Sequence, residues 1–104
     1  MEFLREGEKL ILQDPAKSDY FGKGTIYLTD SRFVFEAMTG GMLSKKSEVK
    51  IDQPLDTIQS VSIPDGKTLM IQFAGSVEPT KVHTGAAAKW EAAIKSALAV
   101  REKM

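Results

Sequence analysis

The sequence predicts a mainly β fold, a seven-stranded antiparallel sheet curled into a partly open barrel or sandwich and capped by one C-terminal amphipathic α-helix. Short runs rich in β-branched and aromatic residues alternate with turn signals along residues 9–82, which is typical of small barrels and sandwiches. From Ala86 onward the apolar residues follow a helical period instead. Strands and helices do not alternate, so a parallel doubly wound sheet is not expected.

Four strands are expected in the first half of the chain, at residues 9–12, 24–28, 32–38 and 48–52. In the last of these, Val49 and Ile51 alternate with charged residues, the period-two pattern of a half-buried strand. We expect a turn at residues 13–19 (QDPAKSD) and another at 52–54 (DQP). A hairpin is predicted at residues 29–32 (TDSR), where Asp30 and Ser31 can bond the local backbone.

Three more strands are expected at residues 58–63, 68–73 and 78–82. The first two are separated by Asp65-Gly66, a strong hairpin signal. The terminal helix is expected over residues 86–103, with Thr84 as its N-cap. Its apolar stripe consists of Trp90, Ala93, Ile94, Ala97 and Leu98. We expect this stripe to close one mouth of the curled sheet.

The amino-acid composition excludes several classes of protein. The 104 residues carry 14 Lys plus Arg, 14 Asp plus Glu, one His and no Cys, and we expect residues 1–104 to form a single domain. Without Cys there is no disulfide framework, and one His cannot form a multi-histidine metal site. The balanced charge argues against nucleic-acid binding. Without a membrane span or a secretory signal, the expected location is cytoplasmic.

Signals for catalysis are weak, and we expect a non-enzymatic protein without a metal or cofactor. The chain has no G-x-S-x-G elbow and no phosphate-loop spacing. His83 is the best candidate for a catalytic group, but the sequence pairs it with no nucleophile and no orienting acid. A loop or capping role for His83 is the expected interpretation.

Residues 22–36 (GKGTIYLTDSRFVFE) carry a recognisable pattern, in which a G-x-I-x-L-T strand leads through a polar turn into an Arg-aromatic strand. The matching positions are Gly24, Ile26, Leu28, Thr29, Arg32, Phe33 and Phe35. Weaker matches are Leu4, Gly7, Glu8, Lys9, Leu10, residues 54–61, Trp90 and Ile94. The chain resembles the pleckstrin-homology superfold, in particular its GRAM and bacterial PH-like branches. The same pattern is similar to the GLUE domain of membrane-trafficking adaptors.

The resemblance implies a module that binds phospholipid headgroups at the open end of the barrel through basic residues. The residues expected there are Lys17 in the first loop, Lys23 at the start of the second strand, Lys45 and Lys46 in the third–fourth loop, and Lys50 just beyond. Residues 43–50 carry a net charge of +2, and residues 1–42 carry −2. The family's phosphoinositide pattern is incomplete, because Thr25 stands where an Arg would follow Lys23. Ordinary solvated surface lysines are the alternative interpretation.

Met42 and Leu43 stand in the expected third–fourth loop, where apolar residues are unusual. They are candidates for contact with a membrane or a protein partner, and the alternative is that Leu43 folds back onto the barrel. The sequence therefore predicts a non-enzymatic module that binds an anionic phospholipid surface peripherally at the inner membrane face. A protein-interaction or self-assembly domain of the same fold, without lipid binding, is the second hypothesis.

Overall fold

Seven antiparallel strands form one sheet in the order β4-β3-β2-β1-β7-β6-β5. The strands are β1 (Leu10–Ser18), β2 (Gly22–Thr29), β3 (Arg32–Thr39), β4 (Lys46–Pro54), β5 (Ile58–Ser62), β6 (Thr68–Phe73) and β7 (Thr80–His83). A 3-10 turn, η1 (Leu55–Thr57), joins β4 to β5, and α1 (Ala87–Glu102) ends the chain. The computed structural model describes residues 4–39 and 46–102, without the side chains of Thr39, Arg101 and Glu102. The predicted fold class is confirmed.

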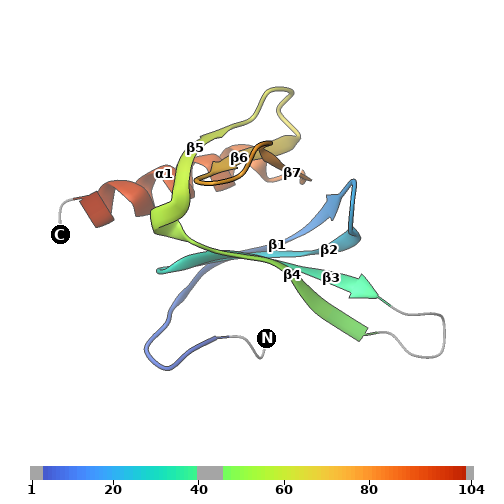
Figure 1. Ribbon diagram of the computed structural model, residues 1–104, viewed down its shortest axis with the longest axis horizontal. Coiled ribbons are helices and arrows are strands. Elements are labelled where there is room, and N and C mark those ends of the chain that lie inside the picture. The colour runs from blue at the N-terminus through green and yellow to red at the C-terminus, as the bar shows by residue number, and fades with distance from the viewer. Residues whose placement is uncertain (1–3, 40–45, 103–104) are drawn as a thin grey trace.

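The sheet folds into two layers around one core. Figure 1 shows β1–β4 as one layer and β5–β7 as the other, with α1 packed on β5 and β6. The Phe33 ring lies 6.2 Å from that of Phe73 and 6.0 Å from that of Trp90, measured between centroids. These three side chains come from β3, β6 and α1, so the core joins both layers to the helix.

The apolar stripe predicted for the helix faces this core. Trp90 and Ile94 are fully buried, and Ala93, Ala97 and Leu98 are partly buried against the core. The helix is also fastened to β1, because Trp90 Nε1–H donates to Asp14 Oδ2 at 2.7 Å and Lys89 Nζ lies 2.9 Å from the same oxygen. The first turns of α1 are therefore held firmly against the middle of β1.

The turn expected at residues 13–19 is wrong, because β1 continues through Pro15 to Ser18. Proline lacks the N–H of a sheet ladder and is tolerated only where one side of a strand is open. Pro15 pairs with Thr25 of β2, whereas Lys17 is the only β1 residue in register with β7. The side of β1 away from β2 thus has no strand next to Pro15 in the described sheet. Lys17 consequently lies in a strand and not in the first loop.

The expected loop between β3 and β4 also changes. β4 begins at Lys46 and runs to Pro54, so Lys46 lies in the strand and not in the loop, and no turn interrupts the chain at residues 52–54. The two short hairpins are confirmed. Gly66 adopts a φ of +80° and its N–H donates to Ile63 O, and Thr29 Oγ1 accepts the N–H groups of Ser31 and Arg32.

Candidate functional site

Lys17 and Lys23 face each other across the β1–β2 hairpin. They are register partners, and both are exposed. Because directly opposite like charges repel, this pair is unfavourable for the fold unless something anionic lies beside it. We call residues 17–23 the lysine hairpin.

The turn of the lysine hairpin presents two aromatic side chains. Ser18 Oγ accepts the backbone N–H groups of Tyr20 and Phe21, at 3.1 and 3.2 Å, which fixes the turn. The Tyr20 side chain is 85% exposed and that of Phe21 is 40% exposed. Phe21 also contacts the Phe35 ring, with 6.3 Å between centroids. Tyr20 therefore projects into solvent from a base that Phe21 holds against the core. The sequence analysis missed both aromatics, although Phe21-Gly22, where β2 begins with a glycine at a φ of +79°, was a usable turn signal.

A hollow of about 540 Å³ lies beside this turn. Its lining comes from residues 18–21, from Lys50 and Ile51 of β4, and from residues 78–81 at the start of β7. The structure therefore brings the β1–β2 turn, β4 and the β6–β7 connection together around one hollow. Lys81 joins Lys50 at this hollow, and its exposed position in a weak strand gave no signal in the sequence.

The β4 lysines behave differently from the hairpin pair. Lys50 Nζ lies 2.7 Å from Glu48 Oε2, and this bond, together with the Lys50 charge, lowers the pKa of the Glu48 carboxyl. Lys46 is exposed at the first position of β4. Lys45, Met42 and Leu43 lie outside the described residues, so their predicted contacts stay predictions.

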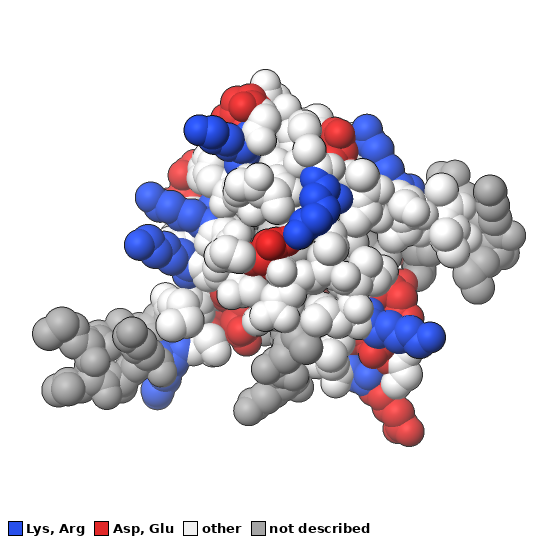
Figure 2. All heavy atoms as spheres, turned by 180° about the vertical axis from the view of Figure 1, so that it is seen from behind, with Lys and Arg blue, Asp and Glu red and all other residues white. Residues whose placement is uncertain are grey.

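Several Lys and Arg side chains gather along the left edge of the face shown in Figure 2. Acidic side chains are interspersed among them, and two of these, Asp19 and Glu78, line the hollow itself. The end of the barrel is thus locally basic without being a uniformly positive mouth. Such a surface favours weak electrostatic attraction over tight capture of one headgroup.

His83 fastens the hairpin turn to the rest of the sheet. Its Nε2 lies 3.0 Å from Asp19 Oδ1, and its Nδ1 lies 3.0 Å from Thr68 Oγ1. The Thr68 hydroxyl is buried and donates to Asp65 Oδ2 at 2.9 Å. A hydroxyl in that position is committed to two neighbours and is no accessible nucleophile. The structure therefore gives His83 of β7 a bridging role between the β1–β2 turn and β6.

The opposite end of the β2–β3 hairpin holds a buried ion network. Arg32 Nε and Nη2 donate to the two carboxylate oxygens of Glu8, at 2.8 and 3.0 Å, and Nη1 donates to Asp52 Oδ2 at 2.7 Å. The Arg32 bonds hold the pKa of Glu8 far below its usual range, although burial opposes them. Arg32 lies at the far end of the β2–β3 hairpin from Lys23, and its guanidinium already binds Glu8 and Asp52.

In residues 4–39 and 46–102, no group of three or more Asp, Glu or His side chains could hold a metal ion. Within the same ranges, no helix is long and apolar enough to cross a membrane.

Comparison with known proteins gives one informative result. No family model and no curated protein matches the sequence. The structure is similar to that of the Vps36 N-terminal PH domain, with a TM-score of 0.65 over 93% of this chain and 86% of that chain. The sequence identity is 20%, so the likeness concerns the fold. It supports the predicted pleckstrin-homology-like architecture and does not single out the GRAM branch.

Proposed function

We propose that this chain, pleckstrin-homology-like in its fold, is a non-enzymatic binding module that attaches peripherally to anionic membrane surfaces through the lysine hairpin. One observation carries the proposal: an exposed aromatic turn stands between two paired, exposed lysines. Aromatic side chains favour the membrane–water interface, and each Lys close to an anionic surface contributes about 1 kcal/mol of attraction.

The surroundings of the hairpin support the same chemistry. Lys50 and Lys81 line the neighbouring hollow, and Lys46 lies on β4, the same strand as Lys50. An anionic surface would relieve the repulsion between Lys17 and Lys23, which no described carboxylate neutralises within ion-pair distance. Asp19 and Glu78 limit the net attraction, so we propose recognition of surface charge and not of one particular headgroup. The location that follows is the cytoplasmic face of a membrane, and assignment to the GRAM branch stays a proposal.

Vesicle sedimentation tests the proposal. The wild-type chain should pellet with phosphatidylcholine vesicles that contain phosphatidylserine, and much less with pure phosphatidylcholine. The double variant Lys17→Gln/Lys23→Gln should bind the anionic vesicles about tenfold or more weakly. High salt should remove most of the difference between the vesicles, because exposed charges are screened.

A matched control uses two exposed lysines from elsewhere, Lys9 and Lys95. The double variant Lys9→Gln/Lys95→Gln removes the same charge from the chain and should bind as the wild type does. Equal loss of binding in both double variants would show that only total charge matters, and the hairpin site would be abandoned.

A further inference from the structure

A second hollow, of about 840 Å³, lies at the other end of the molecule between α1, the first residues of the described chain and the β2–β3 turn. This volume is in the range of ligand-binding clefts. The lysine hairpin contributes nothing to it. We call it the helix groove, and its walls are formed mainly by Glu6, Ile11, Asp30, Ala93, Ala97 and Val100.

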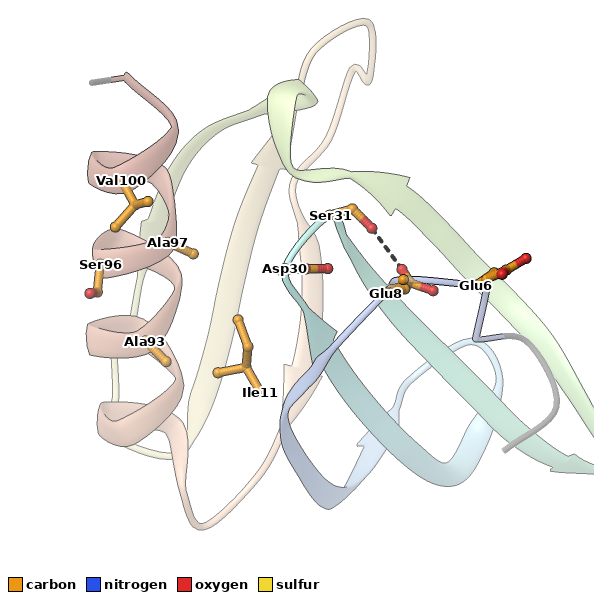
Figure 3. Close-up of a pocket in the computed structure, with 10 residues that line it drawn as sticks. Glu6, Glu8, Ile11, Asp30, Ser31, Ala93, Ser96, Ala97 and Val100 are labelled. Atoms are coloured by element: carbon orange, nitrogen blue, oxygen red, sulfur yellow. Dashed lines mark hydrogen bonds between the residues drawn. The ribbon is translucent and has the colours of Figure 1, made fainter. Parts of the chain in front are cut away.

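One side of the helix groove is apolar. Figure 3 shows Ile11 pointing toward the helix and Ala93 and Ala97 pointing toward Ile11. The Ile11 side chain is 46% exposed and that of Val100 is 59% exposed. Because alanines leave the helix backbone close to the hollow, another chain could approach α1 closely there. Ala93 and Ala97 are only partly buried against the core, so part of this apolar surface stays accessible beside the exposed Ile11 and Val100.

The opposite side of the groove is acidic. Glu6 and Asp30 are exposed residues of the N-terminal segment and the β2–β3 turn. Glu8 also lines the groove, but Arg32 compensates its charge. No Lys or Arg stands among the described lining residues. An anionic lipid or a nucleic acid would be repelled here, whereas a positively charged segment would be attracted.

The fold explains why the groove stays open. Trp90 and Lys89 hold the start of α1 on the Asp14 side chain of β1. A helix does not continue the backbone hydrogen-bond ladder of β1 as a neighbouring strand would. Lys17 is the only β1 residue in register with β7, so the strand edge near Ile11 has no strand neighbour within the described sheet. Backbone polar groups on an open strand edge are available to an incoming chain.

We propose that the helix groove is a docking site for a linear protein segment that combines apolar side chains with Lys or Arg. Its apolar side chains would lie between Ile11 and the helix, and its basic side chains would meet the acidic side formed by Glu6 and by Asp30, whose Oδ1 also accepts the Lys9 N–H at 3.2 Å. This site is independent of the membrane function proposed above, because it lies at a different end of the fold and has the opposite charge.

Selection from a phage-displayed library of random 12-residue peptides tests the proposal, with the full chain as bait. We expect the selected peptides to combine apolar residues with Lys or Arg. Binding of these synthetic peptides, measured by fluorescence anisotropy, should weaken about tenfold in Val100→Lys, which replaces apolar contact with repulsion. Ala99→Lys adds the same charge at the neighbouring exposed position and should bind as the wild type does. Glu6→Gln should weaken binding by a smaller factor and reduce its salt dependence.

Several results would overturn the proposal. These are failure to select any peptide, selection of acidic peptides, or binding that Val100→Lys leaves unchanged. Peptide-induced changes in amide NMR shifts at the lysine hairpin instead of at Ile11 and Ala97 would also overturn it.

Two other occupants of the groove would give different results, and either would replace the peptide proposal. A dimer that Val100→Lys dissociates would indicate a second copy of the chain. Saturable binding of dodecyl maltoside at the same amides, with no peptide binding, would indicate an acyl chain. Vesicle binding should be unaffected by Val100→Lys, so the two proposals fail separately.

Discussion

At the scale of single residues, Arg32 shows how a polar group is buried at low cost. Its guanidinium donates three hydrogen bonds to Glu8 and Asp52, and Thr29 and Ser31 hydroxyls donate to the Glu8 carboxylate at 2.7 Å. A charge removed from water is tolerated only when such bonds replace its hydration. The network therefore fixes the N-terminal segment onto the β2–β3 turn, which forms the acidic side of the helix groove.

Replacement of Glu8 by Gln should lower the free energy of unfolding by about 3 kcal/mol at pH 7, since Arg32 would lose its main buried partner. The pH dependence should change as well. Folding lowers the Glu8 pKa below its ordinary value of 4.5, so the unfolded chain takes up the proton first, and the stability that Glu8 supplies is present above that value and lost as the pH falls below it.

Urea denaturation at a series of pH values checks this prediction. The wild type should lose more stability than Glu8→Gln between about pH 5 and pH 3, so their unfolding free energies should converge. Glu6→Gln, an exposed neighbour, is the control and should change stability by about 0.5 kcal/mol or less. Parallel curves for the wild type and Glu8→Gln would show that Glu8 contributes no acid-sensitive stability.

At the scale of elements, two kinds of contact hold α1 against the sheet, and we call the second of them the anchor. The first is the apolar stripe on the core, and the anchor is the Asp14 carboxylate, which accepts the Trp90 N–H and pairs with Lys89. The pKa of the Asp14 carboxyl is lowered, mainly by the hydrogen bond from Trp90 and next by the hydrogen bond from Lys89. The anchor sets where the helix crosses β1 and therefore where the groove begins.

Replacement of Asp14 by Ala should destabilise the fold by about 1–3 kcal/mol, because the indole N–H of the fully buried Trp90 would lose its acceptor. Lys89→Ala removes only an exposed ion pair and should cost about 1 kcal/mol or less. Thermal unfolding of the two variants separates the contribution of the indole hydrogen bond from that of the Lys89 ion pair. Equal destabilisation would assign the anchor to charge attraction and not to the indole bond.

At the scale of the whole molecule, both layers and the helix share one core. Trp90 of α1 contacts Phe33 of β3, whose ring in turn contacts Phe73 of β6, and the chain contains no other Trp. Its emission therefore reports the meeting point of all three parts. The two ends of this assembly carry different chemistry, with basic and aromatic side chains at the lysine hairpin and an acidic, apolar hollow at the helix groove.

Guanidinium unfolding should accordingly be a single transition. The midpoint followed by Trp90 fluorescence should coincide with that followed by far-UV circular dichroism, which is dominated by the backbone of the whole chain. A fluorescence transition at lower denaturant than the circular dichroism transition would mean that α1 leaves the core before the sheet unfolds, and the single-core description would then be wrong.

Local patterns predicted the elements well, because alternation and helical periodicity are properties of neighbouring residues. The run at 68–73, the Asp65-Gly66 hairpin and the Trp90 stripe were all placed correctly. The incorrect predictions, such as the turn at residues 13–19, depend on contacts with parts of the chain outside the segment itself. Pro15 suggests a turn by its own chemistry, and only the missing strand beside it makes it acceptable within β1.

The sequence by itself determined the fold class, the order of strands and helix along the chain, the buried face of the helix, and the two hairpins at residues 29–32 and at Asp65-Gly66, because each shows in residues close together in the chain. Only the tertiary structure decided which side chains meet. It paired Lys17 with Lys23, brought Lys81 to the Lys50 hollow, and set Ile11 opposite Ala97. Those contacts depend on strand register and on where α1 crosses the sheet, and both are fixed by packing of the shared core.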